Sequence, residues 1–448
     1  MKTKSLTIGI LIFLLLMPQF SFAQLPKETE AQKAQRMKWW TDARFGMFIH
    51  WGLYALPARH EWVKNRERMT NEQYQKYFDH FNPDLYNPRE WAKMAKEAGM
   101  KYVVLTAKHH EGFCMWDSKY TDYKCTNTPF GRDIIKEFVE AFRAEGLKVG
   151  FYYSLLDWHH PDYTIDKNHP LRPDSDADYE RLNKGKDMNK YREYMKNQVR
   201  ELLTNYGEIS IIWFDFSFPG KNGKGRDDWD SEGLLKLARS LQPGIIVDDR
   251  LDLRDVEGGW DFTTPEQVKV EKWPEYNGKK IPWETCQTFS GSWGYYRDEY
   301  TWKSPEQLIE LLIESVSKGG NLLLNVGPTG RGTFDYRAQE RLKAMGDWMK
   351  FNSRSIYYCT EASAEFITPA NTVLTYNPST KSLYVHLLVY PLNRINIAGI
   401  ADKVKYIQFL HDASEIRYSI IQGTNDIALQ LPVLKPPVVI PVIEIFLK

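Results

Sequence analysis

The chain lacks a net charge of either sign and has few cysteines. Lys and Arg number 59 against 58 Asp and Glu, which gives a formal net charge of +1 at pH 7. Nucleic acids and anionic membranes are bound by strongly basic faces, so neither is expected as the main partner. The four cysteines form no CxxC motif and no Cys/His spacing typical of zinc sites, so no metal is expected there. Their disulfide pairing stays open (Cys114, Cys125, Cys286 and Cys359).

Long apolar runs are also missing, except at the N-terminus. There, Lys2 and Lys4 precede an apolar run that ends at Met17, and Ser-Phe-Ala precedes Gln24. This order is typical of a secretory signal peptide over residues 1–23, cleaved after Ala23. The run is too short for a membrane-spanning helix, and no later run is long enough. We therefore expect a secreted or periplasmic protein without a membrane span; a homo-oligomer is possible.

Strand-like and helix-like segments alternate over residues 24–355. Helical spacing separates most of the strand-like runs, and proline at the first helical position marks two of the helices, at Pro88 and Pro305. Eight such strands over about 300 residues predict a (β/α)8 TIM-like barrel. Little helical pattern appears in 267–282, so we expect an irregular connection there. The eight runs are Phe45–Trp51, Tyr102–Lys108, Val149–Ser154, Ile209–Asp215, Ile245–Arg250, Asp261–Glu266, Thr285–Phe289 and Asn321–Gly327.

The sequence pattern changes beyond Ser355. Short runs of alternating polar and apolar residues follow one another, separated by Asn-Pro, Gly and Asp turn signals, and no helical spacing intervenes. This pattern predicts an all-β sandwich over residues 356–448. The chain is therefore predicted to hold a catalytic barrel and a smaller β domain.

The most informative strand is the fourth, in the segment GEISIIWFDFSFPG. Its apolar run ends at Asp215, directly after Trp213 and Phe214. In a (β/α)8 barrel the C-terminal ends of the strands hold the catalytic groups. A carboxylate among aromatic rings suits a sugar, whose apolar C–H faces stack on such rings, and aromatic residues make up 14% of this chain. The alternative is an aspartate that only caps the next turn.

Polar residues follow the other strands as well, where a barrel would bring them to one end. Cleavage of a glycosidic bond needs two carboxyl groups, one ionised and one holding a proton. Asp215 suits the first role, and Glu266 and Glu284 are both candidates for the second. The remaining polar and aromatic candidates could hold a sugar (His50, Glu61, Trp62, His109, His110, Glu111, Tyr152, Tyr153, Arg250 and Trp293).

The adjacent histidine pairs 109–110 and 159–160 raise a different possibility, a barrel metallohydrolase. Neighbouring residues on a strand point to opposite faces, so only one histidine of each pair can face the interior unless the backbone is irregular. The sequence has no HxH after the first strand and no HExxH. A catalytic metal is therefore not expected.

Several motifs together resemble the α-L-fucosidases of glycoside hydrolase family 29. They are FGMFIHWG, EWV, AKHHEGF, YYSLLDWHHPDY, IIWFDF, PWETCQTFSGSWGY and GGNLLLNVGPTGRG, and they span about Trp39 to Met349 in family order. The resemblance implies a retaining, exo-acting α-L-fucosidase without a cofactor. It would release terminal α-L-fucose from fucosylated oligosaccharides or glycoconjugates through a covalent intermediate.

The resemblance also assigns roles to single residues. Asp215 matches the nucleophile, and Glu266 matches the acid/base better than its rival Glu284 does. Phe216 stands where Gly or Met is common, which would narrow the space beside the nucleophile. The expected substrate-binding residues are Phe48, His50, Glu61, Trp62, His109, His110, Tyr153, Trp213, Arg250 and Trp293, with Phe48 and Trp293 near the fucose methyl group. A carbohydrate-binding protein without turnover is the alternative, and the linkage preference stays open.

Overall fold

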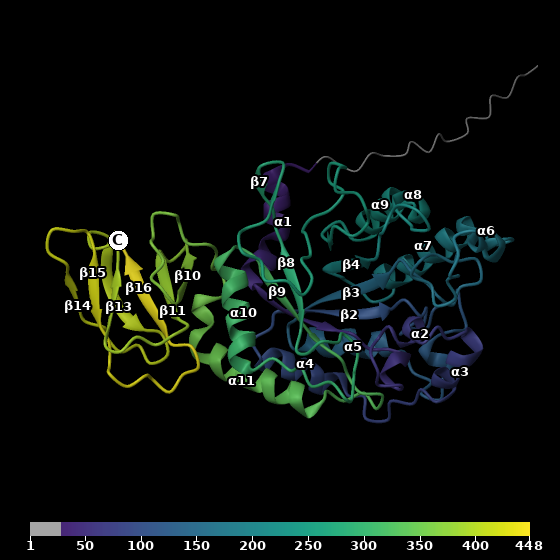
Figure 1. The fold of residues 1–448 in the computed structure, drawn as a ribbon, viewed down its shortest axis with the longest axis horizontal. Helices are drawn as coiled ribbons and strands as arrows, with labels where there is room; N and C mark the ends of the chain where they lie inside the picture. Colours follow the sequence, from purple (N-terminus) through teal and green to yellow (C-terminus); the bar gives the residue numbers. More distant parts are fainter. Residues whose placement is uncertain (1–27) are drawn as a thin grey trace, which may run out of the picture.

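The protein has two parts that lie side by side in an elongated molecule (Figure 1). The computed structural model describes residues 28–448, so the predicted signal peptide lies outside the described residues. A parallel sheet surrounded by helices forms one part, and antiparallel sheets form the other. This arrangement confirms the predicted fold class, a (β/α)8-like barrel followed by a C-terminal β domain.

The barrel is built on a curled sheet of seven parallel strands, in the order β5-β4-β3-β2-β1-β9-β8. Nearly every strand residue is buried, which explains why the strands are continuous apolar runs rather than alternating ones. The strands are β1 (Phe45–Ile49), β2 (Tyr102–Lys108), β3 (Lys148–Ser154), β4 (Ile211–Asp215), β5 (Ile246–Val247), β8 (Glu284–Thr288) and β9 (Asn321–Val326).

The sixth predicted strand closes the barrel between β5 and β8 through single parallel bridges. Phe262 bridges to Asp248 on one side, while Thr263 and Glu266 bridge to Trp283 and Cys286 on the other. Pro265 interrupts the segment, and because proline has no N–H to donate, a continuous ladder cannot form there. Eight strand positions therefore surround the barrel, as the sequence predicts.

Helices cover the outside of the barrel, and two of them begin at Pro88 and Pro305, as the sequence predicts. They are α4 (Pro88–Glu97), α5 (Ile134–Ala144), α7 (Met188–Thr204), α9 (Ser231–Leu241), α10 (Pro305–Ser317) and α11 (Tyr336–Asn352). Asn87 caps α4, and Ser304 with Gln307 forms a capping box on α10. Shorter helices lie in the loops: α2 (Val63–Arg66), α3 (Asn71–Asp79), α6 (Asp178–Asn183) and α8 (Arg226–Trp229). None of the helices within residues 28–448 is long and apolar enough to cross a membrane.

The segment 267–282 has no helix and contains only the hairpin of β6 (Glu275–Tyr276) and β7 (Lys279–Lys280), which confirms the predicted irregularity. At the N-terminal end of the strands, α1 (Glu30–Ala43) closes the barrel floor. Its Trp40 packs in the cluster that fills the barrel interior, and its Arg36 forms a 2.7 Å ion pair with Asp261. The opposite end, where the strands finish, is therefore the open one.

The C-terminal part contains two antiparallel sheets with a core of its own. The first is β10-β11-β16-β13 and the second is β12-β15-β14. It meets the barrel next to α11, where Trp348 Nε1 donates to the Ile440 carbonyl at 3.0 Å. The strands are β10 (Thr372–Asn377), β11 (Ser382–Leu387), β12 (Arg394–Ile397), β13 (Val404–Phe409), β14 (Tyr418–Ile420), β15 (Ile427–Gln430) and β16 (Val442–Leu447). All four cysteines of the chain are buried free thiols.

Candidate active site

Asp215 is the last residue of β4 and lies at the open end of the barrel. Its carboxylate accepts a 2.7 Å hydrogen bond from the Tyr152 hydroxyl on β3 and a 2.8 Å bond from Arg250 Nη1. His110 Nε2 lies 3.9 Å away. Burial and the adjacent carboxylate raise the pKa of Tyr152 well above its usual value, so its hydroxyl stays protonated and donates. The hydrogen bonds from Tyr152 and Arg250 orient the Asp215 carboxylate.

Arg250 joins Asp215 to a second carboxyl group, that of Glu266. Its Nη2 donates to Glu266 Oε2 at 2.7 Å, and its Nε donates to Thr264 Oγ1 at 3.0 Å. The guanidinium lies 4.4 Å above the ring of Trp213. Burial lowers the pKa of Arg250, but the carboxylates of Asp215 and Glu266 outweigh it, and the net pKa is raised. Both carboxyl groups thus lie beside one guanidinium, which is compatible with the separation of about 5–5.5 Å in retaining glycosidases.

Glu284 lies at the other end of the barrel. It is the first residue of β8, and its Oε2 accepts hydrogen bonds from Trp40 Nε1 on α1, at 3.2 Å, and from the Tyr102 hydroxyl. A five-residue strand is about 13 Å long from end to end, so the floor is far from the strand ends. Burial raises the pKa of Glu284 to about 7. Of the two candidates for the second carboxyl group, only Glu266 lies beside Asp215.

Both His109 and His110 lie at the open end, although simple alternation would separate them. The pairing of β2 with β3 is irregular between Thr106 and Lys108, and β2 ends before the histidines. Their ring centroids are 4.0 Å apart, and the His109 ring stacks on that of Tyr152. The irregular backbone that the alternation argument required is therefore present.

The buried histidines His50 and His110 are held in one tautomer by neighbouring groups. His50 Nδ1 lies 2.6 Å from Asn325 Oδ1. His110 Nδ1 lies 2.7 Å from Ser154 Oγ, whose own proton goes to the Leu156 carbonyl. Burial lowers the pKa of both imidazoles, so they are neutral with the proton on Nδ1. Each ring therefore presents Nε2 as a hydrogen-bond acceptor, which suits a sugar hydroxyl.

Glu61 and Trp62, in the loop after β1, also reach the site. Glu61 Oε2 accepts the backbone N–H groups of Trp293, at 3.2 Å, and Gly294, at 2.9 Å. Its Oε1 is buried and accepts no hydrogen bond. The Trp62 ring lies 5.1 Å from that of His110. Glu61 thus anchors the loop after β8, and its Oε1 lies 3.1 Å from His60 Nδ1.

Aromatic rings line the rest of the site. Phe48 lies 5.3 Å from Trp213 and 5.9 Å from Trp293, between ring centroids. Trp293 also lies 5.0 Å from His50. The Tyr152 ring stacks on Trp213. Apolar walls and polar acceptors therefore meet beside Asp215, as a sugar requires.

The prediction that Tyr153 binds the substrate is wrong. Its hydroxyl donates to Gln198 Oε1 on α7 at 2.8 Å, and Lys108 Nζ lies 4.5 Å from its ring, so the side chain points away from the barrel interior. Adjacent strand residues face opposite sides, and it is Tyr152 that contacts Asp215. The motif YYS signals one inward tyrosine, but only the register of β3 decides which.

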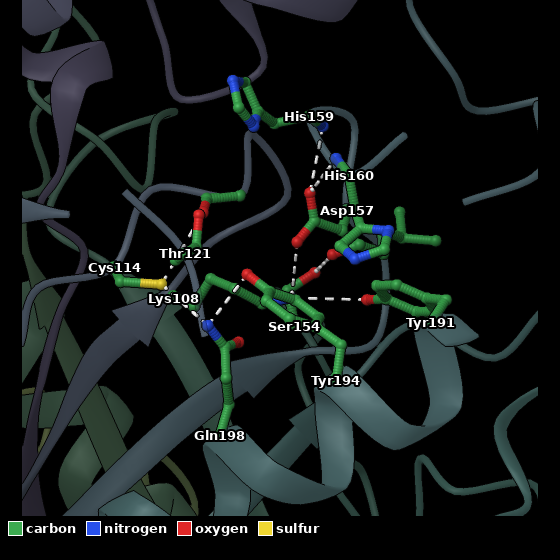
Figure 2. A network of polar contacts seen from close by, with 12 residues as sticks. Lys108, Cys114, Thr121, Ser154, Asp157, His159, His160, Tyr191, Tyr194 and Gln198 are labelled. Carbon is green, nitrogen blue, oxygen red and sulfur yellow. Dashed lines mark hydrogen bonds and ion pairs between the residues drawn. The ribbon is translucent and has the colours of Figure 1, made fainter. Parts of the chain in front are cut away.

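Figure 2 shows the polar network behind β2 and β3, into which the second histidine pair falls. Lys108 Nζ forms a buried 3.0 Å ion pair with Asp157. The other Asp157 oxygen accepts the backbone N–H groups of His159 and His160, at 3.0 and 2.9 Å. These contacts fix the loop after β3. Within residues 28–448, no group of three or more His, Cys, Asp or Glu side chains could hold a metal ion.

A barrel that presents two carboxyl groups, aromatic walls and neutral acceptors at its open end is that of a glycoside hydrolase. A family model described as alpha-L-fucosidase matches residues 19–354, more than half of the chain. The chain belongs to this family.

Solved and curated relatives agree with this. The structure of α-L-fucosidase isoenzyme 1 from Paenibacillus thiaminolyticus is 42% identical, with a TM-score of 0.86 over 93% of this chain and 99% of that one. A GH29 α-L-fucosidase from Bacteroides thetaiotaomicron, trapped as a covalent intermediate with 2-fluoro-fucosyl fluoride, is 28% identical, with a TM-score of 0.80 over 95% and 98%. Human plasma α-L-fucosidase is 30% identical over 406 residues, 84% of this chain and 81% of the relative.

Proposed function

We propose that the protein is a retaining, exo-acting α-L-fucosidase that releases terminal α-L-fucose from fucosylated oligosaccharides or glycoconjugates. The observation that carries this proposal is the pair of carboxyl groups, Asp215 and Glu266, held by one guanidinium at the open end of the barrel. The covalent intermediate trapped in the Bacteroides relative supports a double displacement.

In the first step, Asp215 attacks the anomeric carbon of fucose while the glycosidic bond to the leaving oxygen breaks. Glu266 gives its proton to that oxygen. In the second step, Glu266 takes a proton from a water molecule, whose oxygen attacks the same carbon and displaces Asp215. Two inversions leave the released fucose with its original configuration. The hydrogen bonds from Tyr152 and Arg250 orient the Asp215 carboxylate for the attack.

The remaining residues recognise the sugar. His50 and His110 accept hydrogen bonds from fucose hydroxyls through Nε2, and Glu61 accepts one through Oε1, which makes no hydrogen bond within the protein. Fucose carries a methyl group at C6, and an apolar wall favours it over a hydroxymethyl group. Phe48 and Trp293 supply that wall.

The proposed signal peptide indicates where the enzyme acts. Residues 1–23 direct the enzyme out of the cytoplasm, to the periplasm or the medium, where fucosylated glycans would meet it. N-terminal sequencing of the secreted protein tests this proposal, and we expect the mature chain to begin at Gln24.

Hydrolysis of an aryl α-L-fucoside by three variants tests the catalytic roles. Asp215→Gly should lose almost all turnover, and azide should restore it with β-fucosyl azide as product, because azide then attacks in place of the carboxylate. Glu266→Ala should instead give α-fucosyl azide, formed from the covalent intermediate. Glu284→Gln is the matched control and should stay within a few-fold of wild type. Near-normal turnover by Asp215→Gly would refute the mechanism, and loss in Glu284→Gln with retention in Glu266→Ala would reverse the acid/base role.

Linkage preference follows from a second assay. A panel of oligosaccharides with α1,2-, α1,3-, α1,4- and α1,6-linked fucose identifies which leaving groups the loops admit. Release from none of them, with binding of free fucose retained, would favour a carbohydrate-binding protein without turnover.

A further inference from the structure

Asn325 is a buried amide, and its contact with His50 is only one of two that it makes at the site. It lies near the end of β9, paired with Phe48 of β1 on one side and with Thr288 of β8 on the other. Its side chain contacts two groups that face the proposed fucose site, His50 and the backbone of Trp293. Any buried asparagine needs hydrogen-bond partners, but partners elsewhere in the core would satisfy it equally well. That both partners belong to the site therefore needs an explanation.

The two contacts determine which way the amide points. Nδ2 of Asn325 donates to the Trp293 carbonyl at 2.7 Å, so Oδ1 is the atom that faces His50. His50 Nδ1 lies 2.6 Å from Oδ1 and must donate its proton, because Oδ1 can only accept. The Nε2 of His50 is then without a proton and free to accept.

The same amide holds the loop after β8. The Trp293 backbone is held on both sides: its N–H donates to Glu61 Oε2 at 3.2 Å, and its carbonyl accepts from Asn325 Nδ2. The Trp293 ring lies 5.0 Å from His50 and 5.9 Å from Phe48. One side chain thus fixes a polar acceptor and an apolar wall of the same site.

We infer that Asn325 is a positioning residue of the fucosidase site, which keeps His50 as a hydrogen-bond acceptor and the Trp293 ring against the sugar. This inference rests on the proposed function. Asn325 does not touch the substrate; it acts through His50 and Trp293.

The variants Asn325→Ala and Asn325→Asp separate its two contacts. Asn325→Ala removes both and should lower kcat/KM for an aryl α-L-fucoside about 10- to 100-fold, mainly through KM, because buried hydrogen bonds are lost from substrate-contacting groups. Asn325→Asp still accepts from His50 but cannot donate to Trp293. Its carboxylate should raise the pKa of His50 and protonate Nε2 as the pH falls.

The pH profile is therefore the readout that a merely structural role would not move. In the wild type, burial lowers the pKa of His50 and the charges of His109, Arg250 and His60 lower it further, while the hydrogen bond to Asn325 raises it. Against these, Asn325→Asp should add an ionisation to the acid limb of kcat/KM that the wild type lacks. Double variants with His50→Ala should lose much less than the sum of the single losses, because Asn325 acts through that ring.

Asn321 supplies the matched control on the same strand. It is equally buried, and its Nδ2 donates to the Trp40 carbonyl at 2.8 Å, but at the barrel floor. Asn321→Ala should lower the unfolding temperature as much as Asn325→Ala does and leave kcat/KM unchanged. Wild-type kinetics in both Asn325 variants, or an equal kinetic loss in Asn321→Ala, would overturn the inference. A wild type that releases no fucose would instead refute the proposed function.

Discussion

Tyr152 and Tyr153 are neighbours on β3, and the same substitution should affect them in opposite ways. Tyr152→Phe removes the 2.7 Å hydrogen bond to Asp215, whereas Tyr153→Phe removes the 2.8 Å bond to Gln198 on the outer side of the strand. Both tyrosines are buried, and both substitutions delete a single oxygen atom. Because the two substitutions are chemically identical, any difference between their effects reports which face of β3 each tyrosine lies on.

The expected magnitudes follow from the two acceptors. A hydrogen bond to a charged group contributes about 1.5–3 kcal/mol. At about 1.36 kcal/mol per tenfold in rate, its loss corresponds to a fall of about 10- to 150-fold in kcat/KM for Tyr152→Phe. The Tyr153 bond joins two neutral groups and contributes about 0.5–1.5 kcal/mol, which should appear in stability. The ring above Lys108 is kept in Tyr153→Phe, so that contact is not lost.

Two measurements decide the outcome. Hydrolysis of an aryl α-L-fucoside gives kcat/KM, and thermal unfolding gives the change in stability. We expect Tyr152→Phe to be slow and Tyr153→Phe to have wild-type kinetics with a slightly lower unfolding temperature. Slow turnover by Tyr153→Phe together with normal turnover by Tyr152→Phe would refute the assigned orientation of β3.

Three further outcomes are expected. The fold raises the pKa of Glu284 from 4.5 to about 7, so its contribution to stability is full below about pH 4.5 and is lost as the pH rises through about 7. Between pH 5 and pH 8.5 the free energy of unfolding of Glu284→Gln should rise by about 2.5 kcal/mol relative to that of the wild type, and a constant difference would contradict this. Phe216 has φ +90°, so the free energy of unfolding should be about 1–2 kcal/mol higher for Phe216→Gly than for Phe216→Ala; the reverse order would exclude backbone strain there. A chelator should leave fucoside hydrolysis unchanged, and loss of activity restored by a divalent metal would revive the metallohydrolase alternative.

Part of the site could be predicted from the sequence alone. Asp215 and His50 directly follow apolar runs, Arg250 follows another after two aspartates, and the ends of parallel strands meet at one end of a barrel. The position of Glu284 was informative in the same way. It precedes its predicted strand, Thr285–Phe289, so it belongs at the N-terminal end of the barrel, opposite the site. No sequence pattern indicated the roles of Asn325 and Ser154, because each acts by binding a histidine that comes from another part of the chain.

The sequence by itself determined the alternation of strands and helices, the β domain that follows, and Asp215 at the end of the fourth strand. These depend on hydrophobic spacing and on local signals at helix and strand ends, which act over a few residues. Tertiary structure alone decided that Tyr152 rather than Tyr153 reaches Asp215, and that Glu266 and not Glu284 shares its guanidinium. Strand register and barrel closure bring residues together from distant parts of the chain, and no local pattern specifies which atoms then come within hydrogen-bonding distance.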